Sequence, residues 1–353
     1  MAPILEARNL VKKYGDFQAV KEISFAVEEG EIFGLLGPNG AGKTTAISML
    51  TGVLPPTSGT ATIGGYDVVR ELAQVKKLNG LVPQDLALYP TLSARANLDF
   101  FGRIYGLRGK VLRERVDDVL RIVGLSERAN DSVKDFSGGM KRRVNIAAGL
   151  VHQPRLLFLD EPTVGVDPQS RNNIFESVMQ LNRERGMTIV YTSHYMEEVE
   201  LLCNRVAIMD RGEIVALDTV KNLIAMLGEG VISVGMPGIT EAQVAELAAL
   251  PAVKSASLAV QPPAISAMPA ISATPSTPAQ RKGKHEMPMP EAEPLPVAPA
   301  TPVVRLLVDN SQTALVGIID LAGRNHLTIT SLEILEPNLE TAFLHLTGKR
   351  LRD

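Results

Sequence analysis

A glycine-rich segment, GPNGAGKTT at residues 37–45, joins a short apolar run to a stretch with helical character. It fits the pattern G-x-x-x-x-G-K-[ST], whose glycines let backbone N–H groups turn toward phosphate oxygens. The helix that follows adds its positive end to the same anion. In such a loop Lys43 would bridge the β- and γ-phosphates of a nucleotide, and Thr44 would hold Mg²⁺ through its hydroxyl. The segment therefore predicts a nucleoside triphosphate site.

Two adjacent carboxylates follow the apolar run at the start of LLFLDEPT, which predicts a buried strand. Asp160 would orient on the Mg²⁺ ion, and Glu161 would polarise the water that attacks the γ-phosphate. An Asp-Glu pair after a strand is more often a solvated turn, but the phosphate loop upstream reverses that preference. His194 follows another such run, MTIVYTS. It should therefore emerge at the same sheet edge, where a neutral imidazole can hydrogen-bond the γ-phosphate.

A second glycine-rich segment, DFSGGMKRR at residues 135–143, lies well downstream of the first. It places three cations, Lys141, Arg142 and Arg143, in the first turn of a predicted helix, where they oppose the helix dipole. A nearby anion would relieve that conflict, whereas simple solvation and screening are the alternative for each cation. The segment is therefore a second candidate anion site.

The composition indicates a globular protein with one large and one smaller domain, because 353 residues exceed a typical single domain. Hydrophobic residues make up 45% and charged residues 21%, and a net charge of -3 gives no electrostatic reason to expect nucleic acid. The single cysteine, Cys203, excludes a disulfide framework and is expected in the core. No apolar stretch is long enough to span a bilayer, and the N-terminus lacks a signal-peptide pattern. We therefore expect a cytoplasmic chain that acts at a membrane only through a partner.

Residues 1–230 have the pattern of a mixed α/β domain. Strands with hairpin signals come first, and Glu29-Gly30 in SFAVEEGEIFGLLG predicts a hairpin turn. Residues 92–150 have helical periodicity, which predicts a helical subdomain. After Arg155 the apolar runs RLLFLD and MTIVYTS are joined by an amphipathic helix, as in a parallel sheet buried on both faces.

A smaller domain is expected over residues 231–353. A strand, helix, strand pattern occurs there twice, before and after a segment at 260–302 that is rich in proline and alanine. Two such units form the β-α-β-β-α-β pattern of a small ferredoxin-like domain. The proline-rich segment predicts a disordered linker that opens the central hairpin of this domain.

These motifs, in this order, resemble the ATP-binding subunit of an ABC transporter over residues 4–230. The resemblance implies a P-loop NTPase fold of ABC type, with a mixed core sheet, an antiparallel β-subdomain and a helical subdomain. It implies that Tyr14 stacks on adenine, and that Gln84 in GLVPQD contacts Mg²⁺ or the attacking water when nearby loops close. The residues implied to bind ATP in the phosphate loop are Gly37, Pro38, Asn39, Gly40, Ala41, Gly42, Lys43, Thr44 and Thr45. Those implied to hold Mg²⁺, partly through water, are Thr44, Gln84 and Asp160.

In that family the second glycine-rich segment is the signature motif, which faces the phosphate loop of another subunit. The resemblance implies that two chains enclose two ATP molecules, and that the residues reaching the neighbour's ATP are Ser137, Gly138, Gly139 and Asp167. The catalytic residues that it implies are Glu161, His194 and Gln84.

Two positions of the signature motif depart from the family pattern, since Phe136 and Met140 replace the usual leucine and glutamine. The Met140 side chain has no amide and cannot donate the hydrogen bond that a glutamine side chain could. We still expect hydrolysis, because Ser137 Oγ and the Gly139 N–H could contact phosphate without that amide.

The end of the chain, SLEILEPNLETAFLHLTGKRLRD, resembles ATPase subunits of daunorubicin-resistance-type exporters. That resemblance implies export of a drug, lipid or similar substrate through separate transmembrane permease subunits, with this chain at the inner face of the cell membrane. Import, and a heterodimer in place of a homodimer, remain open. The alternative class is a soluble ABC-type mechanical ATPase acting on nucleic acid or ribosomes, but the sequence has no long heptad arms or basic extension.

One further pattern lies in this last segment, where four apolar side chains share one face of a predicted helix. This pattern predicts docking onto the chain's own domain. The four residues are Leu339, Ala342, Phe343 and Leu346.

Overall fold

A computed structural model describes residues 3–228, 230–260 and 302–348 of the chain. Over these residues helices and strands alternate in a mixed α/β order, as the sequence predicts. None of the described helices is both long enough and apolar enough to cross a membrane. The expected linker at 260–302 lies outside the described residues except for its two ends.

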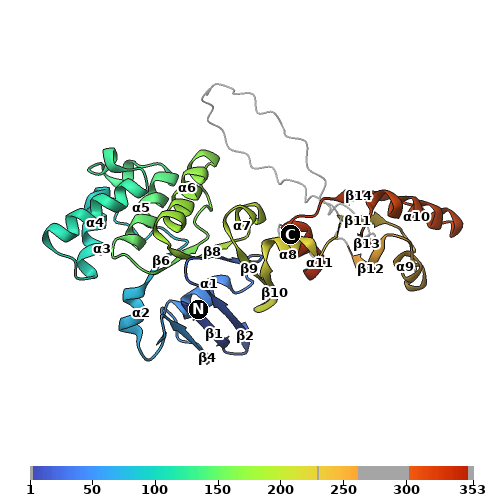
Figure 1. Ribbon diagram of the computed structural model, residues 1–353, viewed down its shortest axis with the longest axis horizontal. Helices are drawn as coiled ribbons and strands as arrows, with labels where there is room; N and C mark the ends of the chain where they lie inside the picture. The colour runs from blue at the N-terminus through green and yellow to red at the C-terminus, as the bar shows by residue number, and fades with distance from the viewer. Residues whose placement is uncertain (1–2, 229, 261–301, 349–353) are drawn as a thin grey trace, which may run out of the picture. The chain divides into compact units, whose positions relative to one another are not determined.

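The chain divides into two compact units, which are described separately (Figure 1). The first unit combines residues 1–226 with residues 337–353, and the second contains residues 227–336. This differs from the sequence expectation, which placed every residue after 230 in the smaller domain. The chain thus leaves the first unit and returns to it with its last helix.

The first unit contains a six-stranded sheet made of β3 (Ile32–Leu36), β6 (Asn79–Val82), β7 (Leu156–Asp160), β8 (Thr188–Ser193), β9 (Arg205–Asp210) and β10 (Glu213–Thr219). The strand order is β10-β9-β3-β8-β7-β6, and all neighbours are parallel except β10 and β9. Every residue of β3, β7 and β8 is buried, as expected for parallel strands covered on both faces.

A second sheet in this unit is antiparallel and contains β1 (Leu5–Tyr14), β2 (Phe17–Val27), β4 (Ser58–Ile63) and β5 (Tyr66–Asp67). Its order is β2-β1-β4-β5, so β2 and β3 lie in different sheets and the hairpin predicted at Glu29-Gly30 is wrong. The reason is burial, because all five residues of β3 are buried and such a strand needs a neighbour on each side and cover on both faces. The centre of the core sheet meets that need.

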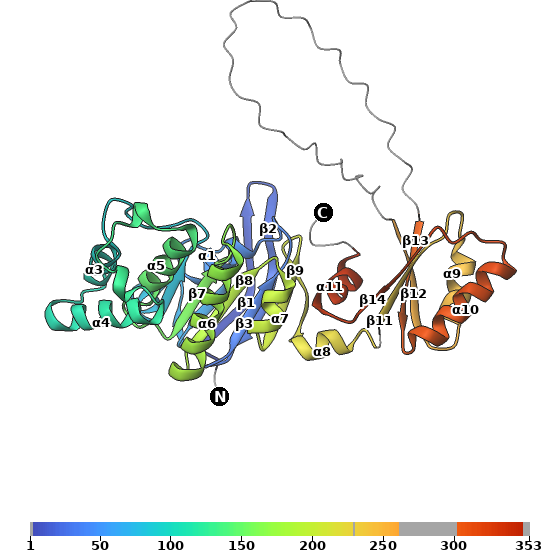
Figure 2. The same cartoon turned by 90° about the horizontal axis from the view of Figure 1, so that it is seen from above.

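The helices of the first unit are α1 (Lys43–Leu50), α2 (Leu72–Leu78), α3 (Ala94–Ile104), α4 (Gly109–Ile122), α5 (Gly138–Leu150), α6 (Pro168–Arg185), α7 (Met196–Leu202), α8 (Val220–Ala225) and α11 (Leu339–Thr347). Helices α3, α4 and α5 fall within the range expected to be helical and pack against one another in both views (Figures 1 and 2). They carry the signature segment at the start of α5.

Side chains of the core sheet alternate between two apolar clusters, one on each face. In β7, Leu157 and Leu159 belong to the cluster shared with α4, α5 and α6, whereas Phe158 belongs to the cluster shared with α1 and the antiparallel sheet. Cys203 is buried in the first of these clusters, as the sequence predicts. The sheet is therefore held from both sides, which fixes the loops at the ends of its strands.

The last helix, α11, packs onto the first unit. Leu339 and Phe343 are fully buried in the cluster that also contains Leu202 of α7 and Leu223 of α8. The backbone N–H of Leu339 donates a hydrogen bond to the Glu200 side chain. The apolar face is therefore buried against the chain, as predicted, but it packs onto the first unit and not onto the smaller domain expected over residues 231–353.

The second unit contains β11 (Gly230–Gly235), α9 (Glu241–Ala248), β12 (Val253–Val260), β13 (Pro302–Val308), α10 (Ser311–Arg324) and β14 (Ser331–Leu335). Its four strands are antiparallel in the order β12-β13-β11-β14, and the helices lie on one face of this sheet (Figure 2). Strand β13 lies between β11 and β12, as in a split β-α-β arrangement, so the predicted ferredoxin-like topology is confirmed.

Candidate active site

The phosphate loop runs from the end of β3 to the start of α1, as its sequence predicts. Gly42 caps α1 with φ of 102°, a conformation that glycine adopts without strain. A Cβ atom at this position would lie 2.6 Å from the carbonyl oxygen of Ala19, so no larger residue fits. The backbone therefore forms a cradle that opens toward the N-terminus of a helix, where an anion is favoured.

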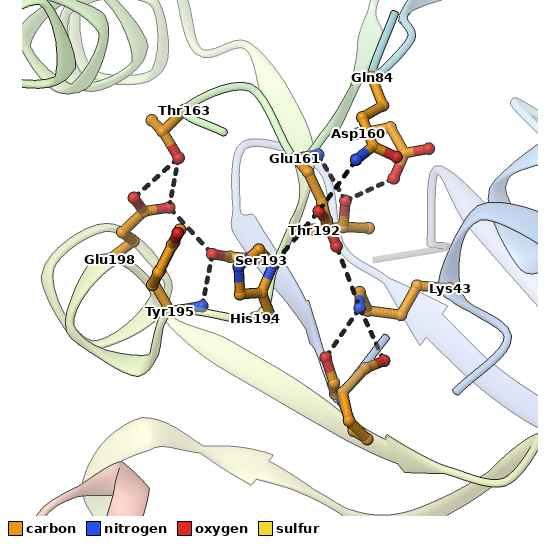
Figure 3. Close-up of polar contacts among 12 residues, drawn as sticks. Lys43, Gln84, Asp160, Glu161, Thr163, Thr192, Ser193, His194, Tyr195 and Glu198 are labelled. Atoms are coloured by element: carbon orange, nitrogen blue, oxygen red, sulfur yellow. Dashed lines mark hydrogen bonds and ion pairs between the residues drawn. The ribbon is translucent and has the colours of Figure 1, made fainter. Parts of the chain in front are cut away.

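Lys43 is nearly buried, with 5% of its surface exposed. Its Nζ donates hydrogen bonds to the carbonyl oxygens of Gly37 at 2.7 Å and Pro38 at 3.1 Å, so the side chain folds back over the loop. Nζ also lies 3.2 Å from Oε1 of Glu161, in a buried ion pair (Figure 3). Burial lowers the pKa of Lys43, and the neighbouring Glu161 opposes that shift. The lysine is thus held by the loop and by the candidate general base together.

Glu161 is the point where the predicted catalytic residues meet (Figure 3). Its Oε2 accepts a hydrogen bond from Gln84 Nε2 at 3.4 Å, and Nδ1 of His194 lies 3.2 Å from the same oxygen. The histidine contact is close but lacks the alignment of a hydrogen bond, so Nδ1 has no hydrogen-bond partner among the described residues. The structure therefore brings Lys43, Gln84 and His194 around one carboxylate.

The backbone at Glu161 has φ of 46°, which is unusual for a residue other than glycine. Thr192 supports this conformation, because its Oγ1 accepts a hydrogen bond from the Glu161 N–H at 2.9 Å. The same hydroxyl donates to Oδ1 of the buried Asp160 at 2.7 Å. Thr192 is not predicted from the sequence, where its one signal is a hydroxyl near the end of the apolar run MTIVYTS.

The signature segment begins α5 at some distance from this cluster in the sequence. Ser137 caps the helix, since its Oγ accepts a hydrogen bond from the Met140 N–H at 3.2 Å. Gly139 packs so closely against α6 that a Cβ atom there would lie 2.1 Å from Oγ of Ser170. The tight contact explains why position 139 is a glycine. Ser137 and Gly138, which precede it, are exposed at the start of the helix.

The basic residues after the signature differ from the sequence expectation, which left them as anion partners or solvated charges. Arg142 is 5% exposed and donates to the carbonyl oxygens of Pro83 at 2.9 Å and Gln84 at 2.6 Å. Arg143 donates to the carbonyl oxygen of Val123 at 2.9 Å. Backbone carbonyls of the chain itself therefore accept hydrogen bonds from both cations, although Nε of Arg143 has no hydrogen-bond partner among the described residues. Arg142 joins α5 to the loop that carries Gln84.

Other predicted site residues lie outside the cluster. Tyr14 is half exposed at the end of β1, with Nζ of Lys12 5.4 Å from its ring centroid. Asp167 is exposed and caps α6 by accepting a hydrogen bond from the Ser170 N–H at 2.9 Å. Within the described part of the chain, no hydrogen bond or ion pair joins Tyr14, Asp167 or Ser137 to Glu161 or its partners. These three residues are therefore separate from the hydrogen-bonded cluster around Glu161.

Oxygen donors suited to a hard cation lie near the phosphate loop. Thr44 is exposed in the first turn of α1, and Asp160 ends β7 close to Lys43 and Glu161. The hydroxyl, carboxylate and the amide oxygen of Gln84 are the ligand types that Mg²⁺ prefers. Over the described residues no group of three acidic, histidine or cysteine side chains forms a metal site by itself. The donor set therefore fits an ion shared with nucleotide phosphates.

Comparison with known proteins agrees with this geometry. A family model described as ABC transporter matches residues 20–164. The linearmycin resistance ATP-binding protein LnrL of Bacillus subtilis is 44% identical over 351 residues, which cover 99% of this chain and 100% of that protein. The daunorubicin resistance ATP-binding protein DrrA3 of Streptomyces coeruleorubidus is 40% identical over 217 residues, covering 62% of this chain and 68% of that protein.

Among solved structures, the chain resembles the ATP-binding cassette MJ0796 in a dimeric post-hydrolysis state bound to ADP and Pi. The TM-score is 0.56 at 27% identity, and the match covers 61% of this chain and 98% of that chain. The match therefore covers a cassette of about the size of the first unit rather than the whole chain.

Proposed function

Because this chain belongs to the ABC transporter family of ATP-binding proteins, we propose that two such subunits close around two ATP molecules to drive export through separate membrane subunits. The chain is an ATPase subunit of the drug-resistance type. The observation that carries the proposal is the convergence of Lys43, Gln84 and His194 on the carboxylate of Glu161.

In the proposed reaction the phosphates of ATP replace Glu161 as the partner of Lys43. Both are acceptors for the same Nζ, and the loop already holds that lysine over the cradle. Glu161 is then free to accept a proton from the water that attacks the γ-phosphorus, and ADP leaves. His194 would hydrogen-bond the γ-phosphate, since its Nδ1 has no hydrogen-bond partner in the described structure. Thr44, Gln84 and Asp160 would hold Mg²⁺, which would neutralise phosphate charge.

The signature segment is proposed to act on the ATP of the second subunit. Ser137 and Gly138 are exposed at the positive end of α5, and Asp167 is exposed at the start of α6. The packing of Gly139 against Ser170 holds these two helix starts together. An exposed helix start that makes no contact with its own phosphate-site cluster suits a partner's nucleotide.

An exposed apolar surface supports a membrane subunit as the other partner. Phe100 and Ile104 lie one turn apart on α3 and are 38% and 63% exposed, and the Tyr89 ring meets Phe100 edge to face. Exposed apolar patches of this kind mark binding surfaces for other proteins. Tyr89 follows Gln84 in the loop that Arg142 holds, so a subunit docked here would touch the segment that reaches the active site. Through it the chain would lie at the inner face of a membrane.

A Phe100→Asp variant tests this surface. It should lose co-purification with the co-expressed membrane subunit while keeping ATP binding. Val53→Asp is the matched control, because Val53 is 66% exposed in the same unit. Equal retention of the membrane subunit by both variants would place its docking surface elsewhere.

The general base and the dimer are tested together with Glu161→Gln. This variant should bind ATP and form a dimer by light scattering, but it should not turn over, because the amide cannot accept the proton from water. The control is Glu184→Gln, because Glu184 is an exposed carboxylate near the end of α6. Ser137→Arg should keep ATP binding by the monomer and abolish hydrolysis. Wild-type turnover in Glu161→Gln would refute the base assignment, and loss of monomer binding in Ser137→Arg would refute action on the partner's ATP.

A further inference from the structure

A second carboxylate, Glu198 of α7, is buried near the active site with only 2% of its surface exposed. Its two oxygens accept hydrogen bonds from Oγ1 of Thr163 at 2.8 and 2.9 Å. Oε2 also accepts from the hydroxyls of Tyr191 and Ser193, each at 2.9 Å. Figure 3 shows Thr163 and Ser193 both reaching this carboxylate. The Glu198 carboxylate therefore accepts hydrogen bonds from three hydroxyl groups.

A buried carboxylate is costly unless its lone pairs are satisfied. The nearest cation is Arg171, whose Nε lies 3.8 Å from Oε1 without making a hydrogen bond. The three hydroxyl groups are therefore the main hydrogen-bond donors to the Glu198 carboxylate. Burial, together with Glu198, raises the pKa of Tyr191 well above its usual range, which keeps that hydroxyl protonated as a donor.

Two of the three hydroxyl groups lie directly beside the candidate catalytic side chains. Thr163 lies two residues after Glu161, in the turn that leads toward α6. Ser193 directly precedes His194, and its Oγ also accepts a hydrogen bond from the Tyr195 N–H at 2.9 Å. Glu198 thus ties the segment after the general base to the segment around the histidine.

The backbone of these segments needs such support. Glu161 has a positive φ, and strained conformations of this kind persist only where the surroundings hold them. Thr192 holds the Glu161 N–H from one side. The Thr163 hydrogen bonds to Glu198 hold the turn that follows it.

We propose that Glu198 is a positioning residue that, through the hydroxyls of Thr163 and Ser193, keeps Glu161 and His194 in place relative to each other. The inference rests on the proposed function, since it takes Glu161 and His194 as the pair that acts on water and γ-phosphate. Glu198 itself touches neither of these side chains through a hydrogen bond among the described residues, and its effect passes through the backbone.

The test compares hydroxyl groups that bind the same carboxylate. Thr163→Val removes a hydroxyl from the turn after Glu161, and Ser193→Ala removes one from the last residue of β8, directly before His194. Tyr191→Phe instead removes a hydroxyl from the interior of β8, three residues before His194 and paired with β7 on one side. All three should lose thermal stability. The first two should also lower kcat by roughly 10- to 100-fold with the KM for ATP unchanged, because a small misplacement of reacting groups slows chemistry without weakening binding. Tyr191→Phe should keep most of its kcat.

Two further variants separate positioning from folding. Thr163→Ser keeps the hydroxyl and should restore kcat, although it is smaller than valine. Glu198→Gln should lower kcat to a similar extent, because its amide cannot accept from all three hydroxyls at once. Equal kcat losses in Tyr191→Phe and Thr163→Val, or no recovery with serine, would show that the network only stabilises the fold.

Glu161→Gln measured in the same assay distinguishes failure of the role proposed for Glu198 from failure of the proposed function. Its loss of turnover together with normal kcat in Thr163→Val and Ser193→Ala would overturn the role of Glu198 alone. Normal turnover in Glu161→Gln would instead overturn the proposed function on which that role rests.

Discussion

Lys43 and Glu161 form a buried ion pair, with Nζ and Oε1 3.2 Å apart and about one-twentieth of each side chain exposed. The residue expected to bind phosphate and the residue expected to activate water are therefore each other's partner in this structure. In the proposed reaction ATP exchanges with this pair, so nucleotide binding and release of the general base would be one event.

Removing one partner of this ion pair should lower the free energy of unfolding. Lys43→Met leaves the Glu161 carboxylate buried without its cation and should lower the free energy of unfolding by about 3 kcal/mol. Adding Glu161→Gln should recover part of this loss, since no buried charge then remains unpaired. Chemical denaturation of the wild type, both single variants and the double variant measures the coupling. Strictly additive effects would contradict the pairing.

Close packing at Gly139 gives a second prediction. A methyl group there would overlap Oγ of Ser170, so Gly139→Ala should destabilise the protein by about 1–3 kcal/mol. The matched control is Gly138→Ala, where the nearest atom to a Cβ is 3.8 Å away. That change should be neutral or slightly stabilising in the helix. Thermal unfolding compares the two, and equal effects would mean that α5 and α6 do not pack this closely.

Asp118 gives a prediction about pH. Hydrogen bonds from Arg185 lower the pKa of its carboxyl to about 2. A lowered pKa contributes stability above pH 4, and this contribution is lost as the pH falls toward 2. Asp118→Asn should therefore lower the free energy of unfolding by about 2 kcal/mol at pH 7, with a difference that shrinks below pH 4. The neighbouring surface residue Asp117, 61% exposed in its pair with Arg95, is the control and should matter little.

Arg142 should couple the signature helix to the loop of Gln84. Arg142→Met removes two donors to the carbonyls of that loop and should lower kcat by roughly 10-fold while leaving ATP affinity unchanged. The control is Arg143→Met, because Arg143 donates to Val123 outside that loop. Steady-state ATPase rates and nucleotide titrations measure both, and a similar kcat in the two variants would exclude a role for the Arg142 contact.

The sheet of the second unit offers a test of its topology. Val260 and Pro302 are register partners in the antiparallel pair β12 and β13. Replacing residues 261–301 by Asn-Gly should therefore close a two-residue hairpin and leave the unit folded. Circular dichroism and thermal unfolding of the full chain with this replacement check it. Loss of the unit's unfolding transition would show that the two halves do not form one sheet.

Much of the site could be predicted because its residues end neighbouring parallel strands. Asp160 and Glu161 follow β7, and His194 follows β8, so one sheet edge collects them. The repeated strand, helix, strand pattern also predicted the topology of the second unit, because its strand and helix segments are short and clearly separated in the sequence.

Supporting residues could not be predicted in the same way. Thr192 and Glu198 are polar residues in segments whose pattern indicates only a buried strand and an amphipathic helix, and their role depends on contacts across the fold. The prediction of a hairpin at Glu29-Gly30 was wrong for a related reason, since a turn signal does not indicate which sheet the next strand joins. The return of α11 to the first unit is likewise a matter of tertiary packing.

That return makes the second unit an insertion rather than an appendage. A stop codon placed after Met226 would delete α11 along with it and expose the apolar side chains of Leu202 and Leu223 that α11 covers. Clean removal requires excising residues 227–336 and rejoining the ends. In the intact chain the inserted unit is joined to the first unit at both of its ends, after α8 and before α11.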